Sequence, residues 1–263
     1  MPPSPRPLTL LTALLAIACS PLAMADGLYV GARYHLGLGP YRVSTLGEGL
    51  PAGDHTGERL LLRDDELGLR LVGNPALSLD AIVQQDRLAF RARDADTPEL
   101  RALRDRRESL NAGLELAWRP SAASVLRIAY LHDALARHQG DQVELHADYT
   151  VEQAAGALRF TPYLDWRHYN ARYSRYYFGV DVDEARASTL PAYAPDHSQR
   201  LDLGLRLAHP LSRDWTTFAD LSLRHYGQAV ADSPLTGHAR YGELSIGAVY
   251  NLRAVLGTRL AGL

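Results

Sequence analysis

Residues 200–209 read RLDLGLRLAH, and leucine occupies every second position from 201 to 207. The residues between these leucines are Asp202, Gly204 and Arg206. Successive side chains of a β-strand point to opposite faces, so this segment predicts a strand with one apolar and one polar face. Alternation over about ten residues is typical of a strand that crosses a membrane in a barrel, between lipid and lumen.

The same alternation recurs along most of the chain. It is found in residues 28–36, 66–72, 109–118, 142–151, 157–169 and 244–252. We count about ten strands of consistent up-and-down direction, and the Gly- and Pro-rich residues 38–57 leave room for a further pair. The prediction is an all-β protein: a transmembrane antiparallel up-and-down β-barrel of about 12 strands, with a short helix in a long external loop.

A soluble β-sandwich also alternates, and two features favour the barrel over it. Aromatic residues that suit an interfacial girdle lie near strand ends, at Trp118, Tyr149, Trp166 and Tyr250. Connection lengths also alternate. Residues 119–123, 152–155 and 210–213 are short connections, whereas residues 134–141, 170–199 and 227–237 are longer. Outer-membrane barrels place short turns in the periplasm and long loops outside.

The N-terminus has the organisation of an export signal. Arg6 precedes an apolar run from Leu8 to Ala18, and Ala23-Met24-Ala25 fits a small-x-small cleavage site. A run of about 11 residues is too short for a membrane-spanning helix. We expect residues 1–25 to be a cleaved signal peptide and residues 26–263 to form a single barrel domain. A lipidated Cys19 is the alternative, and the lack of leucine three positions before it argues against that.

The composition limits the chemistry of the mature chain. Cys19 is the only cysteine, so cleavage would exclude disulfides and thiolate metal sites. Loss of Arg6 from the 28 basic residues, all arginine, leaves a net charge of −3 against 30 acidic residues. This charge does not favour nucleic-acid binding, and we expect no cofactor and no resident metal.

Two loops carry helix signals. Thr97-Pro98 can begin a helix in the charged segment 92–107, and Asp181 with Glu184 fits a capping box that would begin a helix over residues 182–188. The aromatic residues of the second loop can pack onto the barrel mouth, and they either order a lid or form a binding surface. The candidate interaction residues are Tyr173, Tyr176, Tyr177, Phe178, Gly179 and Tyr193.

The polar strand faces carry both signs of charge. Glu144, His146 and Asp148 share one face and could bind a metal or act as a base. The preferred interpretation is a lumen filled by ion pairs, since a small barrel must satisfy its interior polar groups. The residues predicted to face inward include Arg70, Arg159, Arg167, Arg206, Arg224, Glu115, Asp165, Asp202, Asp220 and Glu243.

Several segments resemble the MipA/OmpV family of outer-membrane proteins. They include YSRYYFGV at residues 173–180, TLPAY at residues 189–193 and the opening YVG at residues 29–31. The last predicted strand, SIGAVYNL at residues 245–252, is similar to the terminal signal read by the barrel-assembly machinery, although eleven residues follow it. The resemblance implies a barrel in the Gram-negative outer membrane, surrounded by lipid and lipopolysaccharide. It also implies a scaffold that joins a lytic transglycosylase to a peptidoglycan synthase.

Two other functions remain open at this stage. A narrow, porin-like channel for small solutes would use the polar lumen. A lipid-modifying enzyme would need a histidine and a serine together at the outer membrane surface, and His132 and Ser174 are the residues nearest the strand ends. We expect no enzymatic activity and assign no catalytic residue.

Overall fold

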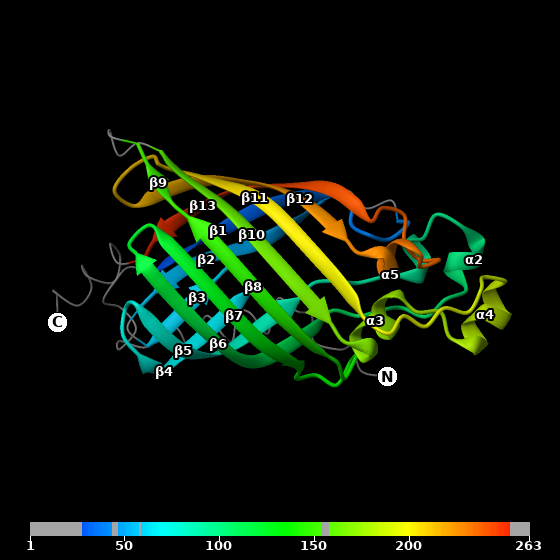
Figure 1. The fold of residues 1–263 in the computed structure, drawn as a ribbon. Helices are drawn as coiled ribbons and strands as arrows, with labels where there is room; N and C mark the ends of the chain where they lie inside the picture. Colours follow the sequence, from blue (N-terminus) through cyan, green and yellow to red (C-terminus); the bar gives the residue numbers. More distant parts are fainter. Residues whose placement is uncertain (1–27, 44–46, 58, 154–157, 253–263) are drawn as a thin grey trace, which may run out of the picture.

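The computed structural model describes residues 28–43, 47–57, 59–153 and 158–252. Within them one antiparallel sheet closes on itself, because β10 pairs with both β8 and β11. The two-residue β9 (Val151–Glu152) continues the β8 pairing with β10, so twelve strands make up the wall. The predicted β-barrel is therefore confirmed (Figure 1).

The wall strands follow each other around the barrel in chain order. They are β1 (Tyr29–Gly37), β2 (Gly47–Thr56), β3 (Leu60–Arg63), β4 (Glu66–Gly73), β5 (Leu77–Asp86), β6 (Ser109–Ser121), β7 (Ser124–Asp133), β8 (Asp141–Tyr149), β10 (Arg159–Tyr169), β11 (Ser198–Pro210), β12 (Trp215–Tyr226) and β13 (Arg240–Asn251). The extra pair expected within residues 38–57 exists, but its second strand, β3, lies just beyond that range.

The first and last strands close the barrel. β1 pairs with β13 over nine residues, from Tyr29 opposite Asn251 to Gly37 opposite Glu243. The terminal strand expected at residues 244–252 is thus the closing strand. The predicted signal peptide, the tail 253–263 and residues 154–155 of the short connection 152–155 lie outside the described residues.

Leucine, valine and isoleucine cover the outside of the wall. Leu203 is 50% exposed, whereas its neighbour Asp202 is only 4% exposed. This contrast is what the RLDLGLRLAH alternation predicts, since an exposed leucine suits contact with lipid. Trp118, Tyr149 and Trp215 are exposed near the short-turn end, where an aromatic girdle is expected. None of the helices in the described part of the chain has the length and apolar character needed to cross a membrane.

The helices gather at the opposite end, as Figure 1 shows. They are α2 (Pro98–Arg101), α3 (Ala171–Phe178), α4 (Val182–Ser188), α5 (Gln228–Ala231) and the 3₁₀ turn η2 (Ala92–Asp94). Thr97 caps α2, and Asp181 with Glu184 forms a full capping box on α4, so both predicted helix starts are confirmed. α3 was not predicted, because the sequence was expected to form only the helix over residues 182–188 in this loop.

Candidate functional site

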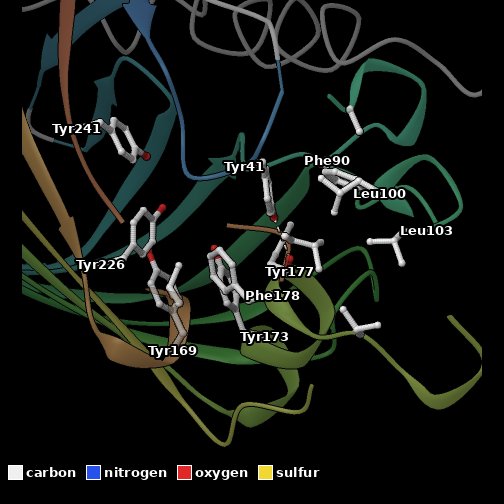
Figure 2. Close-up of a cluster of buried hydrophobic side chains, with 14 residues drawn as sticks. Tyr41, Phe90, Leu100, Leu103, Tyr169, Tyr173, Tyr177, Phe178, Tyr226 and Tyr241 are labelled. Atoms are coloured by element: carbon white, nitrogen blue, oxygen red, sulfur yellow. Dashed lines mark hydrogen bonds between the residues drawn. The ribbon is translucent and has the colours of Figure 1, made fainter. Parts of the chain in front are cut away.

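The long loops form a lid over one end of the barrel. We define the lid as residues 87–108, 170–197 and 227–239. Its buried side chains meet those of the strand ends in one apolar cluster, drawn in Figure 2. The cluster includes Tyr41, Phe90, Leu100, Leu103, Tyr169, Tyr173, Tyr177, Phe178, Val180, Tyr226, Val230 and Leu235.

The six candidate interaction residues occupy two kinds of position. Tyr173, Tyr177 and Phe178 are buried in the lid cluster, at 2%, 0% and 0% exposure. Tyr176 and Tyr193 are partly exposed at its edge. The buried three therefore fix the shape of the lid, and only the other two aromatic residues offer side-chain surface to a partner.

Gly179 makes the tight turn after α3. A Cβ there would lie 2.4 Å from the carbonyl oxygen of Arg175, so no larger residue fits without a shift of the backbone. Its own carbonyl accepts a hydrogen bond of 3.2 Å from the Arg106 guanidinium. Gly179 is thus a structural residue of the lid.

Tyr173 and Tyr177 lie four residues apart on one face of helix α3, and Tyr169 at the end of β10 extends their stack. Asn170 caps the helix by accepting from the Tyr173 N–H at 3.2 Å. The Tyr169 and Tyr173 rings stack at 4.1 Å, and Tyr177 follows at 4.6 Å. Burial raises the pKa of Tyr173 and Tyr177, which remain neutral donors. The Tyr173 hydroxyl donates to Asp86 at 2.8 Å, which fastens the helix to the end of β5.

One buried ion pair joins two parts of the lid that are distant in sequence. The Arg106 guanidinium donates to both Glu184 carboxylate oxygens, at 3.0 and 2.8 Å, and both side chains are at least nine-tenths buried. Burial alone would raise the pKa of Glu184, but the hydrogen bonds from Arg106 and Arg104 lower it. Asp181, the N-cap of α4, pairs with Arg104. We call the Arg106–Glu184 pair the lid latch.

His138 supports the lid from the β7–β8 loop. Its ring lies 4.8 Å from that of Tyr173 and 5.6 Å from that of Tyr177. The Nδ1 atom accepts from the Gly140 N–H at 3.0 Å, so the neutral ring carries its proton on Nε2, which faces Asn111. Burial lowers the pKa of His138 and favours this neutral form.

Ion pairs line the lumen below the lid, mostly between neighbouring strands. The Arg63 guanidinium makes a two-point contact with Glu115, at 2.7 and 3.1 Å, and Arg224 makes the same contact with Asp202, at 2.9 and 3.0 Å. Arg167 pairs with Glu144 at 2.7 Å. The predicted ion-pair lumen is confirmed for eight of the ten residues expected to face inward; Asp165 bonds to His146 instead, and Arg159 has no described pair. The eight are Arg70, Arg167, Arg206, Arg224, Glu115, Asp202, Asp220 and Glu243.

The Glu144, His146 and Asp148 triplet does not act as a unit. The His146 ring lies between Asp165, at 2.7 Å, and Asp148, at 2.8 Å, whereas Glu144 turns to Arg167. Glu144, His146 and Asp165 border a polar cavity of about 60 Å³, which is room for about two water molecules. Within the described ranges, no three histidine or acidic side chains are arranged to hold a metal ion.

The structure does not bring His132 and Ser174 together. Ser174 is buried, and its hydroxyl bonds to the Ser198 hydroxyl at 2.8 Å and donates to the Asn170 carbonyl at 2.9 Å. His132 is exposed and bonds to Asp141 at 2.7 Å. These contacts do not form a histidine-activated serine.

Sequence reasoning missed the lid latch and the role of His138. Both depend on contacts between loops that no local pattern connects. The spacing of Asn170, Tyr173 and Tyr177 was the signal for α3, because a cap followed by residues four apart indicates a helix.

Comparison with known proteins gives a family match over most of the chain. The model of the family described as "MltA-interacting protein MipA" matches residues 24–252. The MltA-interacting protein of Escherichia coli K12 is 27% identical over 169 residues, which cover 62% of this chain and 64% of that protein. The match thus spans slightly less than two thirds of that relative.

Two further matches cover more of the chain. The putative outer membrane protein YiaT of Escherichia coli K12 is 24% identical over 86% of this chain and 91% of its own length. A solved KdgM porin is 7% identical over 86% of this chain and 99% of that chain, with a TM-score of 0.40. By the family match over nearly its whole described length, the chain belongs to the MltA-interacting protein (MipA) family of outer-membrane β-barrels.

Proposed function

We propose that this barrel is a scaffold that holds peptidoglycan-remodelling enzymes, a lytic transglycosylase and a peptidoglycan synthase, at the outer membrane. The observation that carries the proposal is the closed mouth: the lid cluster fills one end of the barrel, and ion pairs line the lumen beneath it. A barrel whose mouth is closed by a packed lid offers its outer surfaces for binding. The name of the Escherichia coli relative, MltA-interacting protein, supports a lytic transglycosylase as one partner.

The short-turn end is the proposed docking face for these enzymes. Short turns of outer-membrane barrels face the periplasm, where peptidoglycan lies. The β11–β12 turn presents Leu211, which is 63% exposed, next to the exposed Arg213 and Trp215. An exposed apolar residue beside an arginine and a tryptophan has the composition of an interface centre.

The lid is the alternative docking face. Tyr176 and Tyr193 would provide contact surface there, held in place by the buried Tyr173, Tyr177, Phe178 and Gly179. A partner on this face would lie outside the cell, so the position of the contact separates the two alternatives.

Site-specific photo-crosslinking tests the scaffold and its docking face together. A photo-reactive residue replaces Arg213 in the short turn or Arg186 on α4, two exposed arginines at opposite ends of the barrel. We expect Arg213 variants, but not Arg186 variants, to give crosslinks to a lytic transglycosylase in intact cells. Crosslinks only from Arg186 would move the docking face to the lid, and no peptidoglycan enzyme from either position would count against the scaffold.

A narrow channel is the second candidate, and one observation favours it. The Arg206 side chain points into the lumen and pairs with Asp220 at 3.0 Å, yet it is 51% exposed. Water therefore reaches part of the interior. Planar-bilayer recording of the purified barrel tests this candidate, and a current no higher than that of an empty bilayer would remove it.

A further inference from the structure

The barrel wall is incomplete in the half nearer the lid. β2 pairs with β1 over residues 47–54, but its described pairing with β3 covers only Asp54–Thr56. The β3–β4 hairpin turns at Asp64-Asp65 while β2 continues seven residues further, to Gly47. In the described chain, residues 47–53 of β2 therefore have a strand partner on one side only, apart from the bond from the Asp64 N–H to the Gly53 carbonyl.

We call the gap beside this part of β2 the side window, and described residues lie on each of its sides. One side is β2, residues 47–53. The Asp64-Asp65 turn forms the lower edge, and residues 85–87 at the end of β5 form the far side. Above it, Val43 pairs with Ala95 of the lid, and the Arg42 carbonyl accepts from the Asp96 N–H at 3.3 Å.

Arginines hold the lower edge in place. Arg33 of β1 donates to Asp64 at 2.8 Å and to Asp65 at 3.1 Å. Arg87 donates to Asp65 from the other side, at 2.6 and 2.9 Å. Because the turn is fastened from both sides, the short hairpin is a fixed feature of the wall.

The sequence of β2 suits an open edge. The Gly57 N–H and the Gly53 carbonyl bond toward β3, so in an antiparallel strand the odd-numbered residues direct their backbone groups to the window. Those residues are Gly47, Gly49, Pro51 and Gly53. Proline has no N–H to leave unpaired, which is why it is found on strand edges. The same positions carry no long apolar side chain toward lipid, and a Cβ on Gly49 would meet nothing within 4 Å.

The rim of the window is polar. Glu48 faces inward beside His35 and is exposed. Asp65 on the lower edge accepts from Arg87 on the far side, where Gln85 also donates to Glu108 at 3.0 Å. Hydrocarbon cannot satisfy these groups or the free backbone of β2, whereas water can. Inside the window lies the Arg33–Asp64 pair, and the half-exposed Arg206 approaches Asp64 at 3.7 Å.

We propose that the side window is a water-filled lateral entrance through which small polar solutes reach the lumen beneath the closed lid. This inference goes beyond the scaffold and deepens the channel candidate, on which its transport role rests. It also fixes the route: solutes pass Glu48 and Arg87, then the Arg33–Asp64–Arg206 group, and do not cross the aromatic cluster.

Amide hydrogen exchange, followed by NMR in lipid nanodiscs, tests the window itself. The Gly49 N–H faces the window, whereas the neighbouring Leu50 N–H faces β1, so the two amides are matched within one strand. We expect Gly49 to exchange about 100-fold faster than Leu50, because only Leu50 is in the hydrogen-bonded ladder. Equal protection of the two amides would show that the wall is closed, and would overturn the proposal whether or not the barrel conducts.

Current recording tests whether the window is the route. Cys19 lies in the predicted signal peptide, so Glu48→Cys would leave one thiol in the mature chain. Attachment of a bulky maleimide at Glu48→Cys is expected to lower the single-channel current about twofold or more. The control is Arg186→Cys on the lid, whose labelling is expected to leave the current unchanged. A fully labelled Glu48→Cys barrel with an unchanged current, or a wild-type barrel without current, would exclude the window as a solute route.

Discussion

Arg106 and Glu184 lie 78 positions apart in sequence, and their side chains join the first and second long loops of the lid. Each is buried, and each satisfies the charge of the other. Two buried charges contribute little net stability as a pair, but loss of one leaves the other without compensation. The lid latch is therefore the residue pair whose change should open the lid most.

The first prediction concerns this pair. Glu184→Gln leaves the Arg106 guanidinium without a counter-ion and should lower the free energy of lid opening by about 3 kcal/mol. Native-state proteolysis in detergent measures the opening. Asp183→Asn is the control, because Asp183 is on the same helix and its pair with Arg186 is fully exposed. Equal cleavage rates for the wild type and Glu184→Gln would contradict the role of the latch.

The second prediction is a pH dependence of the lid. Burial lowers the pKa of His138 in the folded protein, so the unfolded lid binds more protons than the folded one below about pH 6.5. The stability that neutral His138 contributes to the lid is present above that pH. It is lost as the pH falls toward the lowered pKa of His138 in the folded protein. Glu184, whose pKa is also lowered, adds a further loss below about pH 4.5.

Proteolysis of the lid at pH 8 and pH 5 checks the second prediction. Cleavage of the wild type should be faster at pH 5, by at most about tenfold per pH unit from one proton. His138→Gln keeps a polar side chain but does not titrate, and its cleavage should change less between the two values. A wild-type lid equally resistant at both values would refute the prediction.

Single elements show where local sequence suffices. The alternation in β11 predicts the ends of that strand to within two residues, and the capping box of α4 predicts where that helix begins. Both succeed because the whole pattern lies within the element. α3 was missed, since tyrosine and phenylalanine are modest helix formers and its stability comes from packing under the lid. β3 was missed because four residues between Arg59 and Asp64 are too short to show a period.

The third prediction tests how closely the strands approach. A Cβ on Gly113 of β6 would lie 1.8 Å from the Tyr130 carbonyl oxygen of β7, so Gly113→Ala should separate the two strands. Gly242→Ala on β13 is the control, because the nearest atoms are 3.8 Å away. Heat-modifiability on gels measures the folded fraction, which should fall for Gly113→Ala alone. A folded fraction at the wild-type level for Gly113→Ala would show that the strand pair can absorb the methyl group.

At the scale of the whole molecule, the sequence predicted the barrel, its short and long connections and its charged lumen. It gave a lid ordered by aromatic residues as one of two interpretations, but it predicted neither the contacts that close the lid nor the gap beside β2. Both depend on contacts distant in sequence, such as Val43 with Ala95 and Arg33 with Asp65. The sequence signal for the gap is the series Gly47, Gly49, Pro51 and Gly53. Glycine and proline form strands poorly, and their presence here is explained by the unpaired edge of β2.

The fourth prediction separates the lid from the barrel. The wall strands pair with each other without help from residues 93–103, so replacement of that segment by a short Gly-Ser connection should leave the barrel folded. It would remove Leu100 and Leu103 from the lid cluster and open the mouth. We expect normal heat-modifiability together with a larger bilayer current. An unfolded barrel would show that the lid is needed for folding.

The seam between β1 and β13 has a consequence for the order of folding. Its partners lie at opposite ends of the described chain, so their pairing has the highest contact order of any strand pair and should form last. Ala32 lies opposite Ala248 there, next to Gly31 and Gly247, and a Cβ on Gly31 would come within 1.9 Å of the Ala248 carbonyl oxygen. Because these residues are small, β1 and β13 can pair without a prior rearrangement of side chains. We therefore expect the pairing of this seam to be the last step of folding and a rapid one.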